Sequence, residues 1–131
     1  MTNEEIRNAL QKAIGEEQVM LFMKGTPDTP RCGFSARMVA MLGALGVEYA
    51  ALDILPDPRI REQLSAISNW PTIPQLFVNG ELVGGCDIVT EMYETGELAQ
   101  ALGVEAPEAP AEVAEAEASG PAPIGIENRL N

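Results

Sequence analysis

The sequence predicts an α/β protein built around a mixed four-stranded sheet that is flanked by helices. Along the first hundred or so residues, apolar runs of strand length alternate with segments whose apolar residues recur at helical spacing. Further on, two short apolar runs are joined by Asn79-Gly80, which is the strongest short-range signal for a β-hairpin. Helical crossovers join parallel strands and a hairpin joins antiparallel ones, so the predicted sheet is mixed.

The first half of the chain contains two predicted helices and two predicted strands. Residues 3–14 form an amphipathic helix, and the apolar run 18–23 follows it as a buried strand. A second helix begins at Cys32 and ends at Gly46, because glycine readily adopts the left-handed conformation that closes a helix. Residues 47–54 then form a second strand, although their alternation of apolar and polar residues is imperfect.

The second half adds a helix, the hairpin and a last helix. Pro58 is suited to the first turn of the helix that follows the second strand. Residues 75–78 and 81–83 form the two strands of the hairpin, and residues 87–101 form one long closing helix. The residues of that helix expected to face inward are Ile88, Met92 and Leu98. These elements give the order αβαβαββα for a single domain over residues 1–103.

Residues 104–131 differ in composition from the domain that precedes them. They are rich in alanine, proline and glutamate, with six acidic residues against one arginine and no aromatic residue. Such a segment buries too little apolar surface to offset the entropy lost on ordering. We therefore expect a disordered acidic C-terminal tail.

Overall charge and residue usage exclude several classes of function. The chain has a net charge of -12 and no histidine, so we expect neither binding to nucleic acid through phosphates nor a histidine-ligated metal. Two cysteines do not form a secreted disulfide framework, and no apolar run is long enough to span a bilayer. The N-terminal residues are acidic and lack the apolar core of a signal peptide. We expect a cytoplasmic protein with no membrane association.

Cys32 lies where a strand ends, a proline-rich loop turns and a helix begins. Free N–H groups and the helix dipole favour an anionic sulfur there, and Arg31 and Lys24 act in the same direction. The alternative is a small, buried and inert thiol, which the polar surroundings disfavour. Ser35 occupies the place of the second cysteine of a Cys-x-x-Cys motif, and a hydroxyl cannot resolve a mixed disulfide. The predicted site is therefore monothiol, with Ser35 able to bond the thiolate or a free N–H of the first helical turn.

Three segments together resemble the monothiol (CGFS-type) glutaredoxins in order and spacing over about residues 3–102. They are Lys24 with Cys32-Gly33-Phe34-Ser35, then Ser68-Asn69-Trp70-Pro71-Thr72-Ile73-Pro74-Gln75-Leu76, then Gly84-Gly85-Cys86-Asp87-Ile88. The resemblance implies a thioredoxin-like fold, a bound glutathione, and a [2Fe-2S] cluster shared by two subunits. It also implies that Cys32 is both the catalytic thiol and the cluster ligand.

The same resemblance implies how glutathione is bound. Lys24 and Arg61 correspond to cations that hold a terminal carboxylate, although either could instead be a solvated surface charge. Pro74 corresponds to a proline that is cis in the family, and the N–H and C=O of Ile73 before it would pair with the extended glutathione. From the sequence alone, a trans Pro74 would equally suit the start of a strand. Cys86 and Asp87 would bind the γ-glutamyl end through backbone N–H groups and a carboxylate. Asp87 could also be simply a helix N-cap.

Three functions follow from these expectations. The first is a carrier of glutathione-ligated [2Fe-2S] clusters in iron-sulfur protein maturation, in which two chains and two glutathiones supply the four ligands of a cluster-bridged homodimer. Its partners would be apo iron-sulfur acceptor proteins. The second is a glutathione-dependent thiol oxidoreductase that removes glutathione from proteins, with glutathione itself as the resolving thiol. The third is a redox-inert adaptor that uses the tail and exposed surface to bind partners, such as the BolA-like proteins that the resemblance implies.

Overall fold

The computed structural model describes residues 1–104 of the chain. Its helices and strands, in order, are α1 (Asn3–Glu16), β1 (Val19–Met23), α2 (Gly33–Leu45), β2 (Ala50–Asp53), α3 (Pro58–Ser68), β3 (Gln75–Val78), β4 (Glu81–Gly84), α4 (Cys86–Thr95) and α5 (Glu97–Leu102). The tail expected over 104–131 lies outside the described residues, except for Val104. Among the described helices, none combines the length and apolar character needed to cross a membrane.

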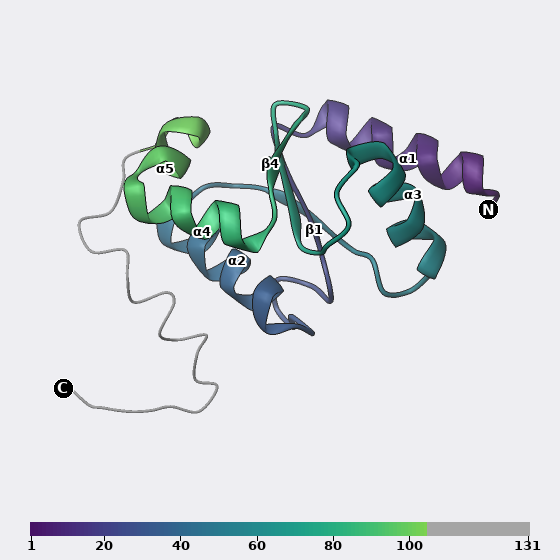
Figure 1. The fold of residues 1–131 in the computed structure, drawn as a ribbon, viewed down its shortest axis with the longest axis horizontal. Coiled ribbons are helices and arrows are strands. Elements are labelled where there is room, and N and C mark those ends of the chain that lie inside the picture. The colour runs from purple at the N-terminus through teal and green to yellow at the C-terminus, as the bar shows by residue number, and fades with distance from the viewer. Residues whose placement is uncertain (105–131) are drawn as a thin grey trace.

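The four strands form one mixed sheet in the order β2-β1-β3-β4. β1 runs parallel to β2 and antiparallel to β3, and β3 pairs with β4 as the antiparallel hairpin. The sheet stands between two helical layers, with α1 and α3 on one side and α2, α4 and α5 on the other (Figure 1). The predicted fold class, a mixed four-stranded sheet flanked by helices, is confirmed.

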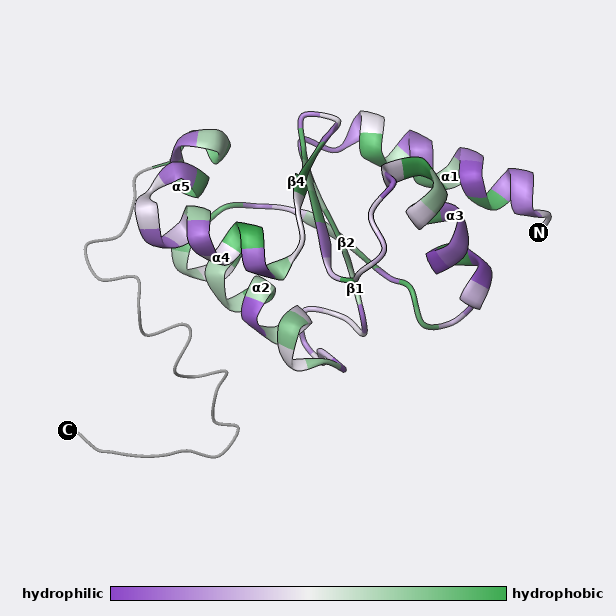
Figure 2. Ribbon diagram, viewed as in Figure 1, coloured by the Kyte–Doolittle hydropathy of each residue, from purple (hydrophilic) through white to green (hydrophobic). Residues whose placement is uncertain are grey.

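Alternating side chains of β1 supply a separate hydrophobic core to each face of the sheet. Leu21 and its alternate neighbours pack against α2, α4 and α5, whereas Phe22 packs with α1 and α3. Phe22 also meets Phe77 of β3 edge to face, with ring centroids 5.6 Å apart. Figure 2 shows apolar strands between helices in which hydrophilic and hydrophobic residues are mixed. Both β1 and β3 are therefore held firmly, and the loops at their ends are built on a rigid base.

The expected single helix over 87–101 is wrong, because the chain forms two helices there. Gly96 lies between them in the left-handed conformation, with φ at 89°. That conformation closes α4 and breaks the helical phase between Ile88 and Leu98. Ile88 is 38% exposed rather than inward, and Val89 faces the core in its place, while Leu98 is buried as expected. The second strand is also shorter than the expected 47–54.

Candidate functional site

A closed loop connects β1 to the start of α2. The Arg31 N–H donates to the Lys24 carbonyl at 2.8 Å, and Thr26 and Thr29 exchange backbone hydrogen bonds of 3.2 and 3.0 Å. Gly25 has a φ of 89°, and a Cβ placed on it would collide with the Thr29 carbonyl oxygen. Glycine is therefore required here for both its backbone conformation and its small size.

Two side chains attach this loop to the protein interior. One oxygen of the Asp53 carboxylate accepts hydrogen bonds from the N–H groups of Gly25 and Leu55, both at 2.9 Å, and so joins the ends of β1 and β2. The hydroxyl of Ser35, which is completely buried, accepts from the Lys24 N–H at 3.0 Å. From the sequence, Ser35 was able to bond the thiolate or a free N–H of the first turn of α2, but the hydrogen bond observed is to the end of β1. Ser35, which stands where a Cys-x-x-Cys motif has its second cysteine, thus has a structural role in this protein.

Cys32 is the N-cap residue of α2, with an extended backbone at φ -154° and ψ 139°. Its thiol makes no capping hydrogen bond, and the residue is partly exposed. Phe34, two residues further on, is 56% exposed at the start of the helix. The sulfur therefore lies at the surface where the positive end of the α2 dipole emerges.

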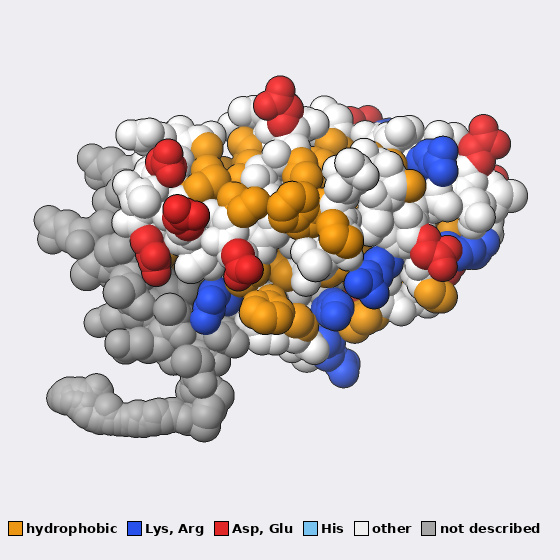
Figure 3. Space-filling model, in the orientation of Figure 1, with side chains coloured by type: hydrophobic (Ala, Val, Ile, Leu, Met, Phe, Trp, Pro, Cys, Tyr) orange, Lys and Arg blue, Asp and Glu red, His pale blue; other side chains and the backbone are white. Residues whose placement is uncertain are grey.

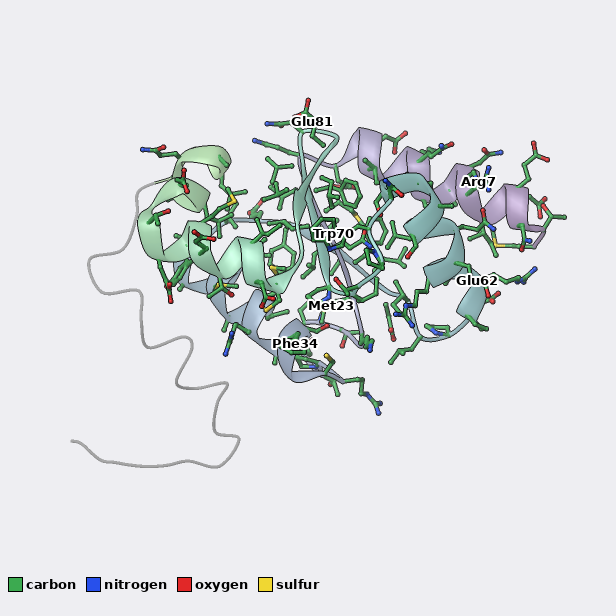
Figure 4. All side chains as sticks on the ribbon, in the orientation of Figure 1. Arg7, Met23, Phe34, Glu62, Trp70 and Glu81 are labelled. Carbon is green, nitrogen blue, oxygen red and sulfur yellow. The ribbon has the colours of Figure 1, made fainter. Side chains whose placement is uncertain are left out.

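An open pocket lies beside Phe34, two residues after Cys32, between the starts of α2 and α4 and the loop that precedes β3. Its lining residues are Phe34, Trp70, Thr72, Ile73, Gly85, Cys86, Asp87 and Ile88. Figure 3 shows apolar side chains gathered on this face, with Lys and Arg side chains along its lower edge. In Figure 4, Trp70 lies near the centre of the molecule and Phe34 below it at the start of α2.

Three of the residues predicted to bind glutathione meet in this pocket. Ile73 and Cys86 are buried at 7% and 8% exposure, whereas Asp87 is exposed. The Ile73–Pro74 peptide bond is cis, as the resemblance implies. Cys86 is the first residue of α4, and its sulfur lies 3.8 Å from the Thr90 hydroxyl oxygen. The interpretation of Asp87 as the helix N-cap is wrong, because Gly85 occupies that position without a side-chain cap.

The two predicted cations, Lys24 and Arg61, lie outside the pocket lining. Lys24 directly follows β1 and is half-buried, whereas Arg61 is exposed on α3 and donates from Nη2 to the Pro71 carbonyl at 3.3 Å. The neighbouring Arg59 is engaged by Asp57, with 2.8 Å between Nη2 and Oδ2. Hydrogen bonds from Arg59 lower the pKa of Asp57. Of these two arginines on α3, Arg61 is thus the one next to the loop over residues 69–74 that precedes β3 (the pocket loop).

Gln75 and Thr72 belong to the site, although no role was predicted for either residue from the sequence. Thr72 lines the pocket, and Gln75 is completely buried in β3 beneath the pocket loop. The amide nitrogen of Gln75 donates to the carbonyls of Trp70 at 2.9 Å and Thr72 at 3.1 Å. A glutamine within a short apolar strand must find buried partners, and that requirement was the available signal for it.

The donor set of this site fits a small anionic peptide better than a bare metal ion. No group of three or more His, Cys, Asp or Glu residues that could hold a metal ion occurs within residues 1–104. Instead the start of α4 offers N–H groups without a side-chain cap, next to the exposed carboxylate of Asp87. An anion and an ammonium group on one ligand would both find partners there.

Gly25 provides a test of how the cysteine loop is held. We expect Gly25→Ala to lower the free energy of unfolding by about 2 kcal/mol or more, through an unfavourable φ and the collision with Thr29. The matched control is Gly43→Ala, since Gly43 is exposed within α2 and nothing lies within 4 Å of an added Cβ. This control should gain stability, by roughly 0.5–1 kcal/mol. Urea denaturation of both variants measures the difference, and equal stability would contradict the proposed loop constraint.

The fold and the site define a protein of the thioredoxin-like class with a single accessible thiol at the start of a helix. Residues 19–83 match the family model described as Glutaredoxin. The chain is 55% identical over 93 residues to a probable monothiol glutaredoxin 2 of Rickettsia typhi, across 71% of this chain and 84% of the relative.

Two solved structures share the fold. A monomeric truncated mutant of Trypanosoma brucei 1-C-Grx1 is 42% identical, with a TM-score of 0.68 over 79% of this chain and 96% of that one. A buckwheat glutaredoxin-glutathione complex is 23% identical, with a TM-score of 0.69 over 77% of this chain and 90% of that one. The chain belongs to the monothiol glutaredoxin family.

Proposed function

We propose that this protein binds glutathione in the pocket beside Cys32 and carries a [2Fe-2S] cluster, as cargo, between two copies of the chain. The observation that carries the proposal is the unequal placement of the sulfurs and of Ser35. Cys32 is partly exposed at a helix start, Cys86 is buried, and the Ser35 hydroxyl is engaged inside the protein. One accessible thiol for each chain suits a shared ligand set better than dithiol chemistry.

Glutathione suits the pocket through its charges and its extended shape. Its γ-glutamyl carboxylate would meet the N–H groups of Cys86 and Asp87 at the start of α4, and its ammonium group would meet the Asp87 carboxylate. The peptide would extend along Ile73 toward Lys24 and Arg61, where its other carboxylate is favoured. Glutathione was bound to the buckwheat protein whose fold this chain shares.

The cluster would be held by ligands from four molecules. A [2Fe-2S] cluster usually takes four thiolates, and the described residues offer one accessible cysteine sulfur for each chain. Two Cys32 thiolates and two glutathione thiolates complete the set in a homodimer. The two glutathiones are not covalently attached to the protein and can dissociate. Their loss would favour release of the cluster to apo iron-sulfur acceptor proteins in the cytoplasm. A BolA-like protein is a further partner that the resemblance implies.

The partial exposure of Cys32 also favours a second function, glutathione-dependent thiol oxidoreduction. The Cys32 thiolate would attack the glutathione sulfur of a glutathionylated protein, forming a Cys32–glutathione disulfide and releasing the protein thiolate. A second glutathione thiolate would then attack that disulfide, giving oxidised glutathione and regenerating Cys32. The protein thiolate takes up the proton that the second glutathione loses on ionising. The cycle therefore balances, with one glutathione thiol oxidised and one protein thiol restored.

Purification under anaerobic conditions with glutathione present separates these functions. We expect coloured protein with the visible charge-transfer absorption of a [2Fe-2S] cluster, and loss of the colour when glutathione is removed. A colourless protein that rapidly reduces a glutathionylated substrate would contradict the carrier function and support the oxidoreductase.

A further inference from the structure

Two side chains hold three successive carbonyl groups of the pocket loop. Gln75 Nε2 donates to Trp70 O at 2.9 Å and to Thr72 O at 3.1 Å, and Arg61 Nη2 donates to Pro71 O at 3.3 Å. In addition, the Trp70 N–H donates to the Ser68 hydroxyl at 3.2 Å. The backbone of this short loop is therefore fixed from the buried side by Gln75 and from the exposed side by Arg61.

Gln75 is suited to fixing the loop because it is itself immobile. It is completely buried in β3 and pairs with Phe22 of the central strand β1. The two carbonyl partners also establish the orientation of the amide, since only its nitrogen can donate. The other amide atom, Oε1, is buried without a hydrogen-bond partner among the described residues. A buried amide oxygen without a hydrogen-bond partner is unfavourable for stability. Glutamine at this position is therefore better explained by what its amide nitrogen does, which is to bond the loop.

The loop that Gln75 holds forms one wall of the pocket and leaves no spare room against the opposite wall. Trp70 and Thr72 both line the pocket, facing Gly85 before α4. A Cβ placed on Gly85 would lie 2.9 Å from Trp70 Nε1 and 3.4 Å from Thr72 Oγ1. A shift of the loop by less than an ångström would therefore change the width of the pocket at this point.

We propose that Gln75 is a positioning residue for the glutathione pocket, acting through the carbonyl groups of Trp70 and Thr72. Arg61 completes the arrangement on the exposed side, where one guanidinium group both bonds the loop and lies next to the predicted carboxylate site. The inference rests on the proposed binding of glutathione, but the position of the loop can be measured without any ligand.

The test compares two buried glutamines in the full-length apo protein. Gln75→Met removes the two loop bonds while retaining a side chain of similar length. Gln63→Met is the matched control, because Gln63 is also buried but accepts from Arg7 Nε at 2.9 Å, between α3 and α1. Trp70 is the one tryptophan of the chain, so its fluorescence emission reports the loop directly.

We expect Gln75→Met to shift the Trp70 emission to longer wavelength and to weaken glutathione binding by calorimetry about tenfold, roughly the effect of one hydrogen bond. Gln63→Met should leave both properties unchanged, even if its melting temperature falls as far. Should Gln75→Met fail to fold, Gln75→Asn keeps an amide in the core but shortens the side chain by one methylene. Its nitrogen then no longer reaches both carbonyl groups, and the emission should shift in the same direction.

The outcomes distinguish the two proposals. An unshifted emission together with wild-type glutathione affinity in a folded Gln75→Met variant, or in Gln75→Asn where Gln75→Met does not fold, would overturn the positioning role. Equal effects in Gln63→Met would also overturn it, since they would show a general loss of stability. Failure of the wild-type protein to bind glutathione would instead overturn the proposed function, and the emission shift would still decide the role of Gln75.

Discussion

Cys32→Ser should abolish cluster binding and leave the fold intact. The Cys32 thiol is partly exposed and makes no capping bond, so little packing is lost with the sulfur. Serine is, moreover, a favourable N-cap residue for α2. A serine hydroxyl stays protonated at neutral pH and does not replace a thiolate on iron. The visible absorption should fall to the baseline after reconstitution with iron, sulfide and glutathione, while circular dichroism stays that of the wild-type protein.

Cys86→Ser is the matched control for this result. Cys86 is 8% exposed with its sulfur 3.8 Å from the Thr90 hydroxyl, so we expect it to contribute its backbone N–H rather than its thiol. This variant should retain the cluster when glutathione is supplied, with at most a modest loss of stability, about 1 kcal/mol. Loss of the cluster in both variants would support four protein thiolates, two from each chain, and would contradict glutathione as a ligand.

The second large expected effect is on assembly, with a monomer when the cluster is absent and a dimer when it is present. Each chain carries a net charge of -12, which opposes association of two copies. In the cluster-bound state, two Cys32 thiolates and two glutathiones must meet at one point, so the pocket faces of the two subunits must be opposed. Phe34 and Ile88, exposed at 56% and 38% beside the pocket, would then be covered.

Sedimentation of apo and reconstituted protein measures this change. Removing glutathione or iron should return the dimer to monomers. A truncated chain ending at residue 103 should behave like the full-length protein, because residues 104–131 contain no cysteine to act as a ligand. A dimer that persists without the cluster, or that requires residues 104–131, would show that protein surface makes the interface and would contradict the ligand-bridged arrangement.

Local patterns in the sequence were sufficient to predict most of the fold. The apolar run of β1, the Asn79-Gly80 turn and Gly46 each specify a structure through nearby residues alone, and each is found as expected. The last helix was mispredicted because Gly96, which lies between two short helices, was taken as an interior residue of one helix. Spacing alone does not show whether a glycine within a helical pattern adopts a left-handed conformation.

The sequence by itself also determined that Cys32 stands alone at a helix start, since Ser35 has no second thiol to offer. Only the tertiary structure decided what surrounds that cysteine. Ser35 bonds to the end of β1, eleven residues away in the chain, and Gln75 bonds back to the loop before it. Such bonds depend on which backbone groups remain unpaired after the sheet forms. That pairing is set by strand register and packing, which no local pattern of residues records.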